Sequence, residues 1–166
     1  MPVSHATEKL NAQFNRAIIS EHDFTEAENY LICFDQKPTD VIKRALLLAA
    51  IVSYARPFLN SERETQSQAI SQLSIKPSKV LLPGELELHK KVMSLRNEAL
   101  AHSQYTRKPV ARSSGSENGF SFQGRPYDLL SENIDVERFL SLCRKLKVYC
   151  MSKSFKLNDH IIKTPN

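Results

Sequence analysis

The residues of this chain that are best suited to chemistry lie together in the segment 95–103, which reads L-R-N-E-A-L-A-H-S. The segment combines a guanidinium, an amide, a carboxylate and an imidazole, on Arg96, Asn97, Glu98 and His102. An arginine binds phosphate through a planar fork of donors, and a histidine gives or takes a proton near neutral pH. Together these groups are able to bind a phosphate and to move a proton.

The spacing of these residues limits how they can meet. Successive residues of an α-helix turn by about 100°, so Arg96 and His102 diverge by about 120°. Glu98 and His102 are four apart and can touch. Arg96 and His102 converge on one phosphate only if the helix loosens near Ala101, or if the partner group comes from a second chain. We therefore interpret the segment as half of a site.

A purely structural interpretation of the same residues is also open. Cations near a helix C-terminus interact favourably with the helix dipole, which describes both Arg96 and His102. Asn97 and Ser103 could satisfy the loose carbonyl groups at the same helix end. In this interpretation, the segment closes a helix and has no further role.

Hydrophobic periodicity predicts the helices that position this segment. The stretch 40–55 is apolar on nearly all sides, which predicts a central helix surrounded by the others. Pro57 ends it, because a proline pushes the preceding residue out of the helical region. The pattern leaves open whether the first two segments form one kinked helix or two. The expected helices cover 7–20, 24–33, 40–55, 85–101 and, from 133–135 onwards, a last helix to about 155.

The end of the central helix, Y-A-R-P-F, is dense in large side chains. We interpret Tyr54 and Phe58 as core residues and Arg56 as a helix-end cation. An alternative brings Arg56 or Tyr54 to the cleft of the segment 95–103.

Residues 104–130 differ in character from the helices on either side. Asn118-Gly119 is a strong turn signal, and apolar alternation at Phe120 and Phe122 follows it. A small β-hairpin or an ordered loop excursion is therefore expected before the last helix. Its cations, with those of the last helix, could follow an RNA backbone, although a solvated basic face is the simpler interpretation. The possible RNA-binding residues are Arg107, Lys108, Arg112, Arg125, Arg144 and Lys145.

The last helix has a core stripe formed by Val136, Phe139, Leu142, Leu146 and Tyr149, with Cys143 and Cys150 beside it. We expect the tail from about 158 to 166 to be frayed. Together the segments predict an all-α, up-and-down bundle of four to five helices in one domain, 1–166. A length of 166 residues suits one domain with a real core.

Composition narrows the function classes. The net charge of +5 permits an anionic partner such as nucleic acid. The three cysteines lack paired spacing and are expected to be reduced, so we expect no metal and no cofactor. The N-terminus does not read as a signal peptide and no apolar run could span a bilayer, so we expect a cytoplasmic protein without a membrane partner. Phosphate-loop, dinucleotide, zinc-protease and hydrolase-elbow motifs are absent from the sequence.

The stretch R-N-E-A-L-A-H, at 96–102, resembles the R-x(4–6)-H signature of the HEPN superfamily, with five intervening residues. The resemblance includes the asparagine after the arginine and the small–apolar–small run before the histidine. It agrees with an all-helical domain that carries the motif late in its third main helix, with one long helix after it.

The resemblance implies a small helical bundle that is commonly dimeric. Many HEPN members are metal-independent endoribonucleases of toxin–antitoxin, phage-defence and RNA-processing systems. By motif match, Arg96 and His102 are catalytic candidates, and Asn97 is a supporting one; we add Glu98 and Ser103 as neighbouring supporting groups. The implied partners are a second copy, RNA, and an antitoxin or other protein. The alternative is a non-catalytic helical module that binds a protein partner or a nucleotide, as other HEPN members do.

Overall fold

The computed structural model describes residues 5–36, 38–59, 73, 75–100, 110–114, 120–124 and 128–163. It is an all-α helical bundle with a β-hairpin before the last helix, as the sequence predicts. The η1 and η3 elements are 3₁₀ turns, and η2 is a π-helical turn. In chain order the elements are α1 (His5–Asp35), α2 (Asp40–Ala55), η1 (Arg56–Phe58), α3 (Pro77–Val80), α4 (Pro83–Ser94), η2 (Leu95–Leu100), β1 (Val110–Ser114), β2 (Phe120–Gly124), η3 (Leu129–Glu132) and α5 (Val136–Lys163).

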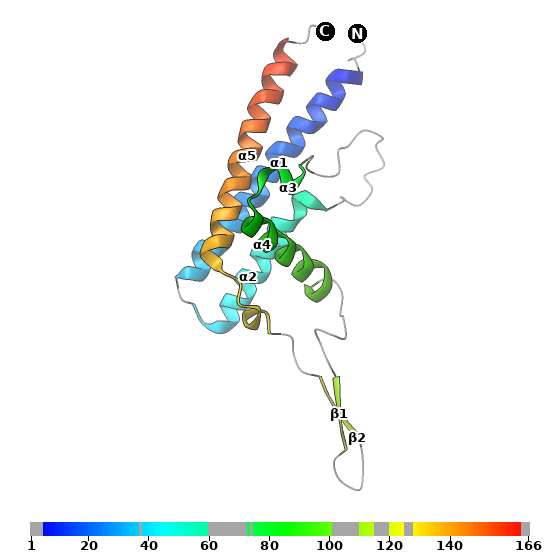
Figure 1. Ribbon diagram of the computed structural model, residues 1–166, viewed down its shortest axis with the longest axis vertical. Helices are drawn as coiled ribbons and strands as arrows, with labels where there is room; N and C mark the ends of the chain where they lie inside the picture. The colour runs from blue at the N-terminus through cyan, green and yellow to red at the C-terminus, as the bar shows by residue number, and fades with distance from the viewer. Residues whose placement is uncertain are drawn as a thin grey trace.

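The two longest helices, α1 and α5, lie side by side and antiparallel, so that both ends of the chain lie at one end of the molecule (Figure 1). Helix α2 packs against α1, and α4 and η2 pack against α2. The core lies between these helices. Its fully buried side chains include Phe24, Leu31, Ile51, Tyr54, Val92, Leu95, Phe139, Leu142, Leu146 and the two cysteines of α5.

The first two predicted segments form a single helix, α1. The sequence D-F-T-E at 23–26 has the form of a capping box, which would start a second helix. In the structure, the carboxylates of Asp23 and Glu26 accept hydrogen bonds from Arg56 instead of capping the backbone. With no proline or glycine in this stretch, the helix continues without a break.

The expectation that α2 is surrounded on all sides is wrong for one of its faces. Leu47, Ala50 and Ile51 are buried, but Val41 is 72% exposed and Leu48 is 39% exposed. The reason is that α1 and α5 form the central pair, and α2 lies on the outside of α1. The helix ends at Ala55 ahead of Pro57, as predicted.

Two helix boundaries differ from those expected. Helix α4 begins at Pro83, where the Glu85 carboxylate accepts a hydrogen bond from the Leu82 N–H at 2.7 Å. Helix α5 continues to Lys163, so the expectation of a frayed tail from about 158 is wrong for residues 158–163. This end of α5 lies alongside the N-terminal half of α1 (Figure 1), which gives its backbone a partner to pack on.

The hairpin pairs β1 with β2 in antiparallel register, from Val110 opposite Gly124 to Ser114 opposite Phe120. A hairpin or ordered excursion was expected between the third and last main helices, and the strands confirm it. The turn at 118–119 lies outside the described residues. None of the helices described is both long and apolar enough to cross a membrane.

Candidate functional site

The candidate segment begins where α4 gives way to η2. Leu95 is fully buried, Arg96 is half-buried and Asn97 is exposed, so the chain passes from core to surface within three residues. The guanidinium of Arg96 donates from Nη1 to the side-chain oxygen of Asn97 at 3.1 Å. Because the amide oxygen of Asn97 is the acceptor, its NH₂ group remains a donor beside the guanidinium. The pair can therefore offer several N–H groups to one anion.

The helix widens at this segment. Leu95–Leu100 forms a π-helical turn, in which hydrogen bonds join residue i to residue i+5. Each turn then holds more residues than an α-helical turn, so the rotation per residue is smaller than about 100°. Over the six residues from Arg96 to His102, this smaller rotation does not reduce the divergence expected for an α-helix. The π-helical turn therefore does not by itself supply the loosening near Ala101 that convergence of the two side chains requires. Single π-helical turns occur frequently at functional sites.

The remaining motif residues are not placed. The positions of His102 and Ser103, and the side chain of Glu98, lie outside the described residues. Of the predicted catalytic and supporting residues, the structure thus brings together Arg96 and Asn97, and the distance from Arg96 to His102 stays a prediction. Arg107, Lys108 and Arg125 also lie outside the described residues. Arg112 lies in β1 opposite Phe122, and its side chain is not described.

A buried hydrogen bond holds α4 against α2 behind this segment. The Tyr54 hydroxyl and the His89 Nδ1 lie 2.8 Å apart, and the His89 ring packs edge-on to Phe58 with a centroid distance of 4.8 Å. Burial lowers the pKa of His89 and raises the pKa of Tyr54 well above its usual value, so both groups are neutral at pH 7. His89 lies two helical turns before Arg96. The bond therefore fixes the rotation of α4 from which η2 continues.

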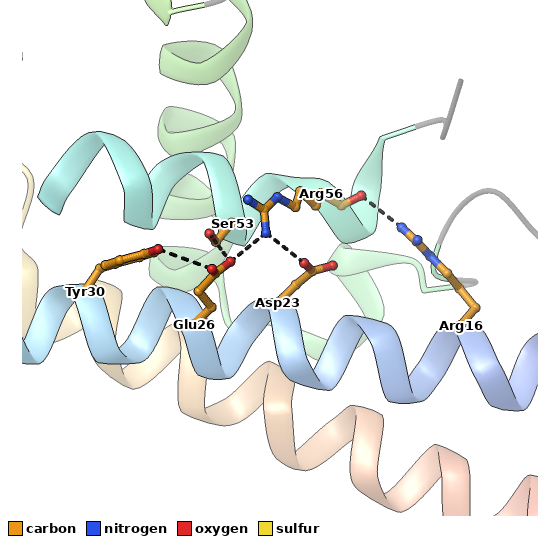
Figure 2. A network of polar contacts seen from close by, with 6 residues as sticks. All are labelled: Arg16, Asp23, Glu26, Tyr30, Ser53 and Arg56. Atoms are coloured by element: carbon orange, nitrogen blue, oxygen red, sulfur yellow. Dashed lines mark hydrogen bonds and ion pairs between the residues drawn. The ribbon is translucent and has the colours of Figure 1, made fainter. Parts of the chain in front are cut away.

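Arg56 has a structural position between α1 and α2 (Figure 2). Its Nη1 lies 2.6 Å from Glu26 Oε2 and 3.3 Å from Asp23 Oδ1. The Ser53 hydroxyl donates to Glu26 at 2.7 Å, and this bond, with Arg56, lowers the pKa of Glu26. Burial raises the pKa of Asp23, although Arg56 opposes the shift. Arg56 is thus the helix-end cation that the sequence suggests, held by two carboxylates of α1.

The same network fixes the turn after α2. Arg16 of α1 donates from Nη2 to the Arg56 carbonyl at 2.9 Å, as Figure 2 shows. Sequence reasoning identified Arg56 but gave Asp23 and Glu26 only a capping role. No local signal could have found this network, because Arg56 lies 30 to 40 residues from its partners in the chain.

The two RNA-binding candidates of α5, Arg144 and Lys145, and the neighbouring Lys147 each contact a carboxylate. Arg144 Nε donates to Glu28 at 2.8 Å, Lys145 donates to Glu85 at 2.6 Å, and Lys147 donates to the second oxygen of Glu28. Burial opposes ionisation of Glu28, but its hydrogen bonds with Arg144 and Lys147 outweigh that effect and lower its pKa. RNA would have to compete with these ion pairs, so the role of Arg144 and Lys145 in RNA binding stays a prediction.

Comparisons with known proteins add no relative. No family model, curated protein or solved structure matches this chain.

Proposed function

We propose that this chain is a HEPN-type, metal-independent endoribonuclease that acts as a homodimer. The observation that carries the proposal is the π-helical turn at Leu95–Leu100, which coincides with the start of the motif and presents Arg96 and Asn97 as neighbouring donors. Donors of this kind suit a phosphodiester, because Arg96 can contact two of its oxygens while the Asn97 amide contacts the same group.

The proposed reaction is a transesterification at phosphorus. One histidine takes the proton of the ribose 2′-hydroxyl, whose oxygen attacks the phosphorus, while the bond to the leaving 5′-oxygen breaks. A second histidine protonates that 5′-oxygen, so the products are a 2′,3′-cyclic phosphate and a 5′-hydroxyl. Arg96 stabilises the charge that develops on the phosphate oxygens. Since the motif has one histidine, His102, a two-fold dimer supplies the second.

The proposal is tested by incubating purified protein with single-stranded RNA in the presence of a chelator. The wild type should cleave, and Arg96→Ala and His102→Ala should each lower the rate by about 10²–10⁴-fold. Lys90→Ala, an exposed cation on the same helix, is the matched control and should cleave like the wild type. The 5′-hydroxyl product is identified by its labelling with a polynucleotide kinase without prior phosphatase treatment.

The opposite result supports the alternative function. If the wild type does not cleave RNA, or if both motif variants cleave at the wild-type rate, the chain is not a nuclease of this type. A non-catalytic helical module that binds a protein partner or a nucleotide would then be the better description.

A further inference from the structure

The hairpin formed by β1 and β2 has two faces of different chemistry. Successive residues of a strand alternate between the two faces of a sheet. In the antiparallel register Arg112 pairs with Phe122, and Ser114 pairs with Phe120. Both phenylalanines and the arginine therefore lie on one face of the hairpin. We call Arg112, Phe120 and Phe122 the aromatic face.

The opposite face of the hairpin carries no large apolar residue. It holds Ala111 and Ser113 of β1, and Ser121 and Gln123 of β2. An antiparallel sheet with one polar and one apolar face normally packs its apolar face on a partner. The composition of the two faces therefore identifies the aromatic face as the one that meets a partner.

No helix of the described residues covers the hairpin. Figure 1 shows that the two strands project from the helical bundle at the end opposite the chain termini, where each strand packs on the other. A two-stranded hairpin by itself is only marginally stable in water. The partner of the aromatic face is thus not one of the helices that the structure describes.

The residue types on the aromatic face favour a nucleic acid as that partner. Every base has a π-face that stacks on an aromatic ring, and this stacking does not require a particular base. An arginine on the same face supplies a cation for the phosphate backbone, and the net charge of +5 favours an anionic ligand. A protein strand added to the hairpin edge would be held by main-chain hydrogen bonds, which give no reason for an aromatic pair.

The spacing of the two phenylalanines favours a single strand over a duplex. Residues two apart in an antiparallel strand are separated by about 6.8 Å along the strand. Stacked bases of a duplex lie about 3.4 Å apart along each strand. Two neighbouring bases must therefore be drawn apart before each can stack on its own phenylalanine, which an unpaired strand permits and a duplex resists.

We propose that the aromatic face binds single-stranded RNA, with neighbouring bases stacked on Phe120 and Phe122 and with Arg112 at the adjacent phosphate. The choice of RNA over single-stranded DNA rests on the proposed function, because stacking on an aromatic ring does not distinguish the two. The hairpin lies between η2 and η3 in chain order, so it follows the segment that carries Arg96. It adds a substrate-binding surface that is separate from the Arg96–Asn97 pair.

The first test is the affinity of the full chain for a labelled, single-stranded 2′-O-methyl RNA, measured by fluorescence anisotropy. The methyl group blocks attack by the 2′-oxygen, so binding is measured without cleavage. Phe122→Leu should raise the Kd by at least about fivefold, because it removes one stacking ring. Phe122→Tyr keeps the ring and should bind like the wild type. Gln123→Leu, on the opposite face of the same strand, is the matched control and should also bind like the wild type.

A second measurement reports stacking directly, because the chain contains no tryptophan. In Phe122→Trp, addition of the unlabelled single strand should quench the tryptophan fluorescence. In Gln123→Trp the fluorescence should change little. A duplex of the same sequence should bind more weakly than the single strand, with a Kd that Phe122→Leu leaves unchanged. The proposal is overturned if the wild type does not bind the single strand, if Phe122→Leu binds it as tightly as the wild type, or if both tryptophans are quenched equally.

Cleavage of unmodified RNA separates this inference from the proposed function. If the wild type binds the single strand through Phe122 but cleaves no RNA, the aromatic face is a binding surface and the nuclease proposal fails. If RNA is cleaved while Phe122→Leu changes neither the Kd nor the KM, the nuclease proposal stands and the role of the hairpin is refuted.

Discussion

Replacing Tyr54 with phenylalanine should destabilise the fold through one buried hydrogen bond. Tyr54 is fully buried, and its hydroxyl lies 2.8 Å from the Nδ1 of His89. Phenylalanine keeps the ring, which packs against Phe24, Phe58 and Phe139 at centroid distances of 5.1–5.7 Å. The change therefore removes the hydrogen bond and leaves the aromatic packing in place.

The expected loss follows from the group that stays behind. His89 is 8% exposed, so water cannot readily replace the lost hydroxyl. Leaving a buried polar group unpaired costs about 1–3 kcal/mol of unfolding free energy. In a chain of 166 residues this lowers the melting temperature by about 2–4 °C for each kcal/mol.

The assay is urea denaturation followed by circular dichroism, at one fixed protein concentration so that any dimer contributes equally. Tyr54→Phe, His89→Phe and the double variant complete a double-mutant cycle. Since the double variant leaves no partner unpaired, it should be clearly less destabilised than the sum of the two single variants. A Tyr54→Phe variant within about 0.5 kcal/mol of the wild type, or strict additivity in the cycle, would refute the reasoning.

Three further outcomes follow from burial. Because burial lowers the folded-state pKa of His89, the unfolded chain binds a proton at this histidine more tightly than the folded chain does. The free energy of unfolding that depends on neutral His89 is therefore complete above about pH 6.5 and declines as the pH falls through that value. His89→Phe should remove this part of the pH dependence in urea titrations. Cys33 is exposed, so a thiol reagent should label it at once; burial raises the pKa of Cys143, and that of Cys150 to about 12, so both should react only after unfolding. Leu95→Ala should lower the free energy of unfolding by about 2–5 kcal/mol in denaturant titrations, because removing its fully buried side chain leaves a cavity. A loss below about 1 kcal/mol would contradict the core position of Leu95.

The sequence alone determined the features that depend on neighbouring residues. The sequence predicts the core stripe of α5, the end of α2 ahead of Pro57, and the hairpin whose strands flank Asn118-Gly119 in the sequence. These features follow from periodicity, proline geometry and turn chemistry, all of which act within a few residues. The motif that begins at Arg96 and Asn97 could also be identified from the sequence, because it consists of residue types and spacings within one short segment. Its α-helical geometry was not correct, since the backbone widens at Leu95.

The tertiary structure decided what depends on distant residues. The helix continues through residues 23–26, where the carboxylates of Asp23 and Glu26 accept hydrogen bonds from Arg56, about thirty residues away, instead of capping a new helix. Arg144 and Lys147 are not free cations, because both contact the single carboxylate of Glu28, which lies 116 and 119 residues away in the sequence. The open face of α2 arises because α1 and α5 pair with each other and leave α2 outside. Hydrophobicity shows that a side chain is to be buried, but only packing determines against which partner.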